Sequence, residues 1–174
     1  MLHHNIKIIP YNPKYAVKTV DMWRKSKEQA IGQKEIHDFE SHVYFLNHIL
    51  TEQFQIELAL MDEEVVGMIA YNDREISQLY IHIEYQGIGI GRALLDKAKV
   101  KSSGKLTLYT FEVNKNAQQF YEKHGFEVIS RGHENEENLP DIWIYVNILD
   151  IKKLSLCQNG IQSWSVLYPA KPVK

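Results

Sequence analysis

The sequence has few of the residues on which several protein classes depend. Its 174 residues include one cysteine, Cys157, which excludes an internal disulfide and a metal site built from cysteines. The formal net charge is -2, and no basic run stands out, so we expect no nucleic-acid partner. No apolar run approaches bilayer-spanning length, and the N-terminal residues lack a signal-peptide core, which predicts no membrane partner and a cytoplasmic location. The eight histidines include no HExxH spacing, so we expect no metal.

The remaining composition is that of an ordinary globular domain, with 44% hydrophobic and 24% charged residues. A chain of this length fits one domain with a sizeable core. Apolar spacing predicts an α/β (α+β) fold with a mixed sheet and the element order β-α-α-β-β-β-α-β-α-β-β. The predicted strands are 6–9, 55–61, 65–71, 75–83, 105–111, 126–130 and 141–148, and the predicted helices are 14–25, 36–50, 88–100 and 116–123.

The character of the sequence changes after Ile148. We therefore predict one domain over residues 1–148 and a C-terminal extension over residues 149–174. For the extension, the sequence leaves open an added strand over 161–168, a contact in a homodimer and a loose tail.

The segment "YQGIGIGRALL", residues 85–95, places three glycines between a predicted strand and a predicted helix. Either the turn needs backbone angles that glycine tolerates, or a ligand approaches the bare main chain. The first amides of a helix have no intrahelical partner and carry partial positive charge, so they suit a phosphate or pyrophosphate. Arg92 adds a cation at the same place, which favours the ligand. A tight strand-to-helix turn is the structural alternative.

A dinucleotide site of the G-x-G-x-x-G type is the other hypothesis for this segment. Glu112 lies about twenty residues downstream at a predicted strand end, where that fold places an acidic residue. The third glycine, however, would have to stand at Arg92 or at Leu94, depending on the register. The spacing therefore argues against an NAD-dependent oxidoreductase.

Two motifs resemble those of the GNAT N-acetyltransferases. "QGIGIG", residues 86–91, is similar to the Q/R-x-x-G-x-G/A signature that holds the pyrophosphate of acetyl-CoA in that family. The preceding "QLYIHIEY" resembles the family's fourth strand, with Ile83 where a proline is frequent. "NKNAQQFYEKHGF" is similar to the family segment N-x-x-A-x-x-F-Y-x-K-x-G-F. The resemblance extends from residue 5 to residue 148 and implies a single-domain GNAT-like acyl-CoA N-acyltransferase fold, with acetyl-CoA as the co-substrate.

The resemblance also implies site residues. Tyr121 is implied as the acid that protonates the departing CoA thiolate, whereas simple packing beside Phe120 is the structural alternative. Glu75 is the candidate base, with an exposed strand-end glutamate as its alternative; His82 and water are the other candidates. The implied cofactor-binding residues are Ile81, His82, Ile83, Gln86, Gly87, Ile88, Gly89, Ile90, Gly91, Arg92 and Asn114.

The predicted function is transfer of the acetyl group of acetyl-CoA to a primary amine of a small molecule or peptide, by direct attack in a ternary complex. A CoA-binding regulatory module with little or no turnover is the alternative. The acceptor's identity stays open. Polar residues that could contact the amine, or simply face solvent, are His37, Ser41, Tyr44 and His48 on a predicted helix and Glu134, Glu136, Glu137 and Asp141 in a polar loop.

Overall fold

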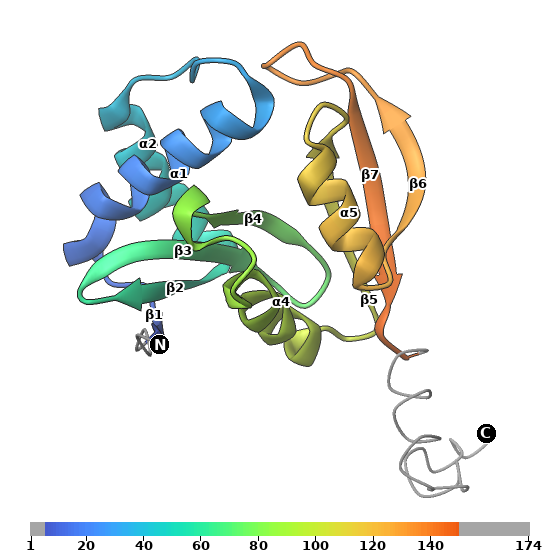
Figure 1. Ribbon diagram of the computed structural model, residues 1–174, viewed down its shortest axis with the longest axis horizontal. Coiled ribbons are helices and arrows are strands. Elements are labelled where there is room, and N and C mark those ends of the chain that lie inside the picture. The colour runs from blue at the N-terminus through green and yellow to red at the C-terminus, as the bar shows by residue number, and fades with distance from the viewer. Residues whose placement is uncertain (1–5, 150–174) are drawn as a thin grey trace, which may run out of the picture.

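The computed structural model describes residues 6–149, which form two antiparallel sheets and their covering helices (Figure 1). The first sheet has the strand order β1-β2-β3-β4, and the second has the order β5-β7-β6. The strands are β1 (Ile6–Pro10), β2 (Gln55–Met61), β3 (Glu64–Tyr71), β4 (Ile76–Ile81), β5 (Lys105–Phe111), β6 (Glu127–Gly132) and β7 (Asp141–Asn147). The helices are η1 (Pro13–Tyr15), α1 (Ala16–Ile31), α2 (Phe39–Phe45), η2 (Leu46–Leu50), α3 (Thr51–Gln53), η3 (Ile83–Tyr85), α4 (Ile90–Lys101) and α5 (Lys115–Lys123).

The element order predicted from apolar spacing is confirmed. Helix α1 runs past the predicted end to Ile31, where Gly32 adopts φ +69° and its amide bonds the Glu28 carbonyl at 2.9 Å. The second helix begins later than predicted, because the Asp38 carboxylate caps it by accepting from the Ser41 amide at 2.7 Å. That helix also widens to π geometry over η2. The predicted strand at 161–168 lies outside the described residues, and the domain boundary at 148 stays a prediction.

The first sheet is buried on both faces. Alternate residues of β2 and β3 point to opposite sides, so Ala59 and Ile69 belong to the cluster that includes α4, whereas Leu58 and Met68 belong to the cluster with α1 and η2. All four of these side chains are fully buried. Figure 1 shows α1 and α2 on one side of this sheet and α4 on the other. Strand β4 pairs with β3 at one edge of this doubly covered sheet.

The two sheets meet at β4 and β5, which differs from the single mixed sheet predicted. Within residues 6–149, the pairing between them is one isolated parallel bridge, Glu75 to Thr107. Beyond that bridge the two strands diverge, and α5 crosses from β5 to β6 on the same side as the gap (Figure 1). The divergence leaves main-chain groups of β4 and β5 facing an opening rather than each other.

Candidate functional site

A cavity of about 620 Å³ lies along the end of β4, the glycine segment and α5. Eight of the cofactor-binding residues predicted from the resemblance line this cavity. These are Ile81, Ile83, Gln86, Gly87, Gly89, Gly91, Arg92 and Asn114. The sequence thus located the wall of this cavity that comes from β4, the glycine turn and the start of α5.

The glycine turn presents free helix amides to this cavity. Gly87 and Gly89 adopt φ +78° and +97°, in the left-handed region that favours glycine. Gly89 is the N-cap of α4 and no side chain of the described residues caps this helix, so its first-turn amides stay available. Ile90 is buried, which anchors the helix start in the core. The amides and the helix dipole together suit an anion.

Gly91 serves a different purpose from the two glycines before it. A Cβ atom at this position would lie 3.3 Å from Phe120 Cε2, closer than most side chains tolerate. Gly91 therefore lets α4 approach Phe120 of α5 beside the cavity, which both residues line. The explanation by backbone angle holds at Gly87 and Gly89, whereas the approach of a ligand to the bare main chain stays a prediction.

The rim of the cavity is cationic. Arg92, Lys115 and Lys123 line it, and no carboxylate of the described residues does. His124 also lines it, and its Nδ1 donates to the Phe120 carbonyl at 2.7 Å, which leaves Nε2 as the free ring nitrogen. Such a rim suits a ligand with several phosphate charges.

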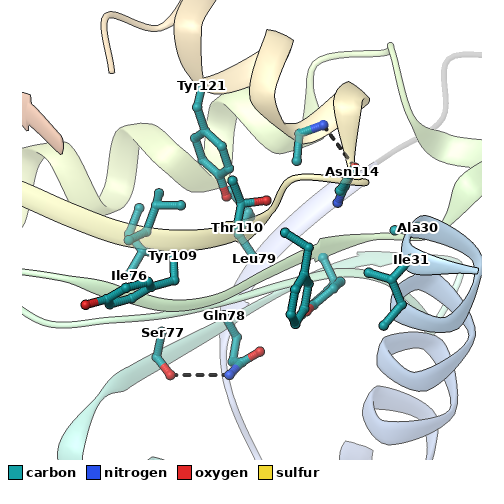
Figure 2. Close-up of a pocket in the computed structure, with 14 residues that line it drawn as sticks. Ala30, Ile31, Ile76, Ser77, Gln78, Leu79, Tyr109, Thr110, Asn114 and Tyr121 are labelled. Atoms are coloured by element: carbon teal, nitrogen blue, oxygen red, sulfur yellow. Dashed lines mark hydrogen bonds between the residues drawn. The ribbon is translucent and has the colours of Figure 1, made fainter. Parts of the chain in front are cut away.

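Asn114 lines the large cavity and follows the end of β5 by three residues. It is the N-cap of α5, and its Oδ1 accepts from the Ala117 amide at 3.1 Å. This bond fixes the side-chain orientation, and Nδ2 points away from it with its two N–H groups as donors (Figure 2).

Tyr121 separates the large cavity from a smaller one of about 70 Å³ in the gap between β4 and β5. Its ring is buried and makes edge contacts with Phe120 and Phe126. Burial raises its pKa, so the phenol holds its proton more firmly than a free tyrosine. Figure 2 shows the hydroxyl pointing toward the two strands. The residues that line both cavities are Ala30, Leu79, Tyr80, Asn114, Ala117 and Tyr121.

Three residues predicted to bind the cofactor do not line the cavity. His82 accepts from the Glu84 amide through Nδ1 at 3.3 Å and faces Tyr85, so it caps η3. Ile88 is 53% exposed at the tip of the turn, and Ile90 points into the core. Their main-chain groups, rather than their side chains, belong to the turn.

Glu75 is exposed and lines neither cavity. Its main chain closes a turn with Asn72 and forms the bridge to Thr107. The structure therefore does not bring this carboxylate to Tyr121. Glu112, the acidic residue of the dinucleotide hypothesis, pairs with Arg131 instead of facing a ribose site.

The sequence missed the contribution of α1 to the site. Ser26, Gln29 and Ala30 line the large cavity, although they precede β4 by about fifty residues. The sequence also missed Tyr80, which lines both cavities. Burial raises the pKa of its hydroxyl to about 12, and the positive charge of Lys27 acts against this rise. One sequence signal could have indicated this contribution of α1: polar or small residues lie on one face of the predicted helix 14–25 and its continuation.

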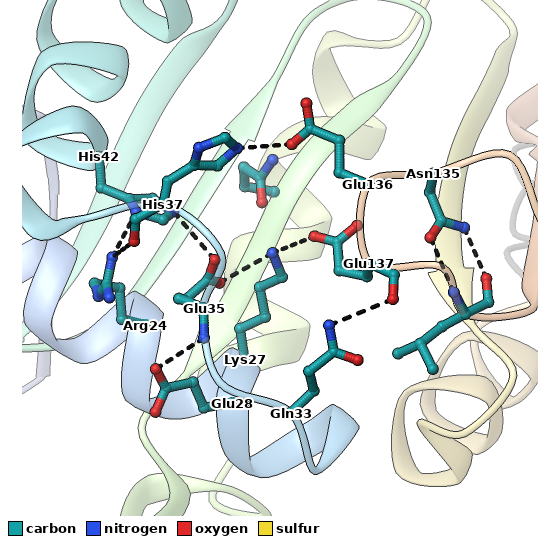
Figure 3. Close-up of polar contacts among 12 residues, drawn as sticks. Arg24, Lys27, Glu28, Gln33, Glu35, His37, His42, Asn135, Glu136 and Glu137 are labelled. Atoms are coloured by element: carbon teal, nitrogen blue, oxygen red, sulfur yellow. Dashed lines mark hydrogen bonds and ion pairs between the residues drawn. The ribbon is translucent and has the colours of Figure 1, made fainter.

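An ion-pair network joins the loop after α1 to the loop between β6 and β7 (Figure 3). Lys27 Nζ lies 2.9 Å from Glu35 Oε1 and 2.6 Å from Glu137 Oε1, and the three side chains are at most 15% exposed. We call these three residues the Lys27 cluster. His37 Nε2 lies 2.7 Å from Glu136 Oε2 beside it. Of the polar residues predicted near the acceptor, His37, Glu136 and Glu137 are thus brought together.

His42 supports the Lys27 cluster from α2. Its Nε2 lies 3.6 Å from Glu35 Oε2, and Arg24 Nη1 donates to its Nδ1 at 2.8 Å. Burial lowers the pKa of His42, which favours the neutral ring. In contrast, Tyr44 and His48 are exposed and contact each other, away from both cavities.

Residues 6–149 contain neither a metal-binding group of side chains nor a membrane-spanning helix. No group of three or more His, Cys, Asp or Glu side chains there is placed to hold a metal ion. No helix there has the length and apolar character that crossing a bilayer requires.

Comparisons with known proteins agree with this geometry. The family model described as an acetyltransferase (GNAT) domain matches residues 24–139, more than half of the chain. The peptidyl-lysine N-acetyltransferase YjaB of Salmonella typhimurium is 29% identical over 129 residues, which cover 71% of this chain and 84% of that protein. YjaB of Escherichia coli is 30% identical over 78 residues, covering 45% and 52% of the two chains.

Solved structures share the fold at lower identity. PaiA N-acetyltransferase of Thermoplasma acidophilum, in complex with coenzyme A, superposes with a TM-score of 0.64 at 23% identity, covering 82% of this chain and 99% of that one. A GNAT acetyltransferase of Staphylococcus aureus Mu50 gives a TM-score of 0.68 at 23% identity with the same coverage. With its glycine turn, split sheets and matching family model, this chain belongs to the GNAT acetyltransferases, acyltransferase enzymes that use acetyl-CoA.

Proposed function

We propose that this acetyltransferase acts on a primary amine of a small molecule or peptide, by direct attack in a ternary complex. The observation that carries the proposal is the position of Tyr121, which lines a large cavity on one side and a small one on the other. The large cavity fits the acetyl-CoA arm, and the small cavity fits an amine. The two substrates then meet beside one proton donor, which is the arrangement that direct transfer needs.

In this proposal the glycine turn holds the pyrophosphate. The uncapped amides at the start of α4 donate to its oxygens, and Arg92, Lys115 and Lys123 neutralise the phosphate charges. The pantetheine arm follows the open edge of β4 beside Ile81 and Ile83, where main-chain groups pair with its amides. Asn114 contributes its free Nδ2 donors.

The reaction forms one C–N bond and breaks one C–S bond. The neutral amine attacks the thioester carbonyl carbon, and the sulfur leaves as a thiolate. Tyr121 gives its proton to that sulfur and is reprotonated by one of the protons that the attacking nitrogen loses. An ammonium acceptor loses two protons in all: one ends on the CoA thiol and one goes to solvent.

The lining of the small cavity explains how the amine loses its first proton. Its polar residues, such as Ser77, Gln78 and Thr110, carry no charge, and no carboxylate of the described residues lines it (Figure 2). Desolvation in such a place disfavours ammonium relative to the free amine. We therefore infer that the acceptor enters as the neutral amine, with water as the proton acceptor. The earlier candidate Glu75 would have to act from outside the cavity.

The curated relatives support a peptide acceptor, because both YjaB proteins are named peptidyl-lysine N-acetyltransferases. A lysine side chain offers an amine at the end of a slender chain, which suits a cavity of about 70 Å³. The alternative of a regulatory module without turnover has less support, since Tyr121 stands where a proton donor is needed.

Initial-rate kinetics test the proposal. Release of free CoA thiol is measured while acetyl-CoA and butylamine are varied together. Direct transfer in a ternary complex predicts intersecting double-reciprocal lines. Parallel lines would indicate an acetyl-enzyme intermediate, and binding of acetyl-CoA without thiol release for any amine would support the regulatory module.

A further inference from the structure

An aromatic pair lies on the outer face of the second sheet, with Tyr109 exposed and Trp143 half-buried. Tyr109 of β5 and Trp143 of β7 are direct register partners. Their rings stack with centroids 5.8 Å apart and an interplanar angle of 7°. Tyr109 is 65% exposed, which is unusual for so large an aromatic side chain. The pair thus presents a flat aromatic surface to solvent.

This surface is continuous with the proposed acceptor cavity. Tyr109 itself lines the small cavity, together with Gln78 of β4 and Tyr121 of α5. Figure 2 shows Tyr109 and Gln78 beside the strands on the side away from the Tyr121 backbone. An amine that reaches Tyr121 through the small cavity therefore carries the rest of its molecule past Tyr109.

On the side of the small cavity opposite Tyr109, two loops of the protein narrow the approach of an acceptor. The Lys27 cluster and the His37 to Glu136 pair hold the loop after α1 against the loop between β6 and β7 (Figure 3). Gln33 Nε2 also donates to the Glu137 carbonyl at 3.3 Å. An extended acceptor would have to break buried ion pairs to enter there, whereas the aromatic surface is open.

The outer face also suits a cation. Glu75 is exposed and bridges to Thr107, which shares the outer face of β5 with Tyr109 because alternate residues of a strand point the same way. On the same face, Lys105 Nζ lies 4.4 Å from the ring centroid of Tyr145, so an ammonium already binds an aromatic ring there. The Glu75 carboxylate and the rings of Tyr109 and Trp143 complement a lysine side chain of a polypeptide.

We propose that Tyr109 and Trp143 form a docking surface for the polypeptide that carries the acceptor lysine, with Glu75 contributing charge at its edge. The inference rests on the proposed function and adds the surface that distinguishes a peptide from a small amine. A small amine fills the cavity beside Tyr121, where it meets Tyr109 but does not reach Trp143, which lines neither cavity. A peptide places its backbone and neighbouring side chains on it.

The test compares two acceptors that offer the same amine. One is butylamine, and the other is a lysine-containing pentapeptide with both ends blocked. Trp143→Ala, at the member of the pair that lines neither cavity, should lower kcat/KM for the peptide about tenfold, mainly through KM, and leave butylamine within about twofold. Trp143→Phe keeps an aromatic face and should restore the peptide value. Val128→Ala, at an exposed aliphatic residue of β6, is the matched control and should change neither acceptor.

The outcomes separate this inference from the proposed function. Wild-type enzyme that turns over both acceptors, with an equal loss or no loss in Trp143→Ala, overturns the docking surface alone. Wild-type enzyme that binds coenzyme A but acetylates neither amine overturns the proposed function and the inference with it. A dimer in sedimentation velocity that Trp143→Ser converts to monomer would show that a second copy of the chain covers this face, which also contradicts the inference.

Discussion

Lys27 and Glu137 are 110 residues apart in sequence, and their side chains meet at 2.6 Å in the structure. The contact ties α1, which covers the first sheet, to the loop between β6 and β7 of the second sheet. Glu35 completes the pair into a buried cluster. Removal of one member of such a cluster leaves the others buried without full charge compensation.

Lys27→Met therefore tests the stabilising role of this cluster. We expect the free energy of unfolding to fall by about 3–5 kcal/mol, measured by urea denaturation. Lys25→Met is the matched control, because Lys25 pairs with Asp21 on the exposed face of the same helix. That exposed pair should contribute about 0.3–0.5 kcal/mol. Equal effects of the two substitutions would show that the buried cluster is not stabilising.

The difference in the free energy of unfolding between wild type and Lys27→Met should depend on pH in a definite direction. Burial opposes the ionisation of Lys27, but its hydrogen bonds to Glu137 and Glu35 outweigh burial and raise its pKa. The stability that this raised pKa contributes is present below the pKa of Lys27 in the unfolded chain and is lost as pH rises through its folded-state pKa.

Burial also opposes the ionisation of Glu137, whereas the bond from Lys27 lowers its pKa below the ordinary 4.5. The stability that this lowered pKa contributes is present above pH 4.5 and is lost as pH falls through the folded-state pKa of Glu137. The gap between wild type and Lys27→Met should therefore be widest near neutral pH and shrink at both extremes; a gap that widens in acid contradicts this account.

Tyr121→Phe tests the assignment of the acid. The substitution removes one hydroxyl and keeps the packing against Phe120 and Phe126. We expect kcat to fall by a factor of about 10²–10⁴, while the Kd for coenzyme A stays unchanged. Stopped-flow thiol release and calorimetry give the two values. Unchanged turnover would remove Tyr121 from the mechanism.

Gly89→Ala tests the glycine turn. A side chain at φ +97° costs about 1–2 kcal/mol of backbone strain, and a Cβ there stands beside the proposed pyrophosphate site. Gly32→Ala is the control, because Gly32 has φ +69° at the end of α1 and lies outside the cavity. Both variants should lose similar stability, but only Gly89→Ala should raise the Kd for coenzyme A, by about tenfold. Similar affinities would show that the turn does not hold the coenzyme.

The pH profile tests the inference that the acceptor enters as a neutral amine. The value of kcat/KM should rise with pH until it reaches the pKa of the amine itself, and the break should move when acceptors of lower pKa are used. Glu75→Gln should leave the profile within about twofold, because Glu75 lines neither cavity. A break that stays fixed across acceptors and disappears in Glu75→Gln would restore this carboxylate as the base.

Local sequence signals predicted what depends on local structure. The helix that starts at the glycine turn and the helix that carries Tyr121 each follow from residues within a dozen positions of one another. Apolar spacing also predicted every strand of residues 6–149, since each strand packs alternate faces on a core. The split of the sheet at Glu75 was not predictable, because strand pairing depends on how β4 and β5 diverge.

Contacts across long sequence separations could not be predicted from a single sequence. Lys27, Glu35 and Glu137 read as ordinary surface charges until the fold buries them together. Ser26 likewise joins the site only because α1 packs across the first sheet. None of these four residues belongs to a motif, so the three-dimensional arrangement was required to find them.

The most direct test of the account is a titration of ¹⁵N-labelled protein with coenzyme A, followed by amide NMR. If the free amides at the start of α4 hold the pyrophosphate, the largest shifts should fall on residues 87–92, with Ile90, Gly91 and Arg92 showing slowed amide exchange. Saturable binding whose largest shifts lie elsewhere, with residues 87–92 unchanged, would contradict the account.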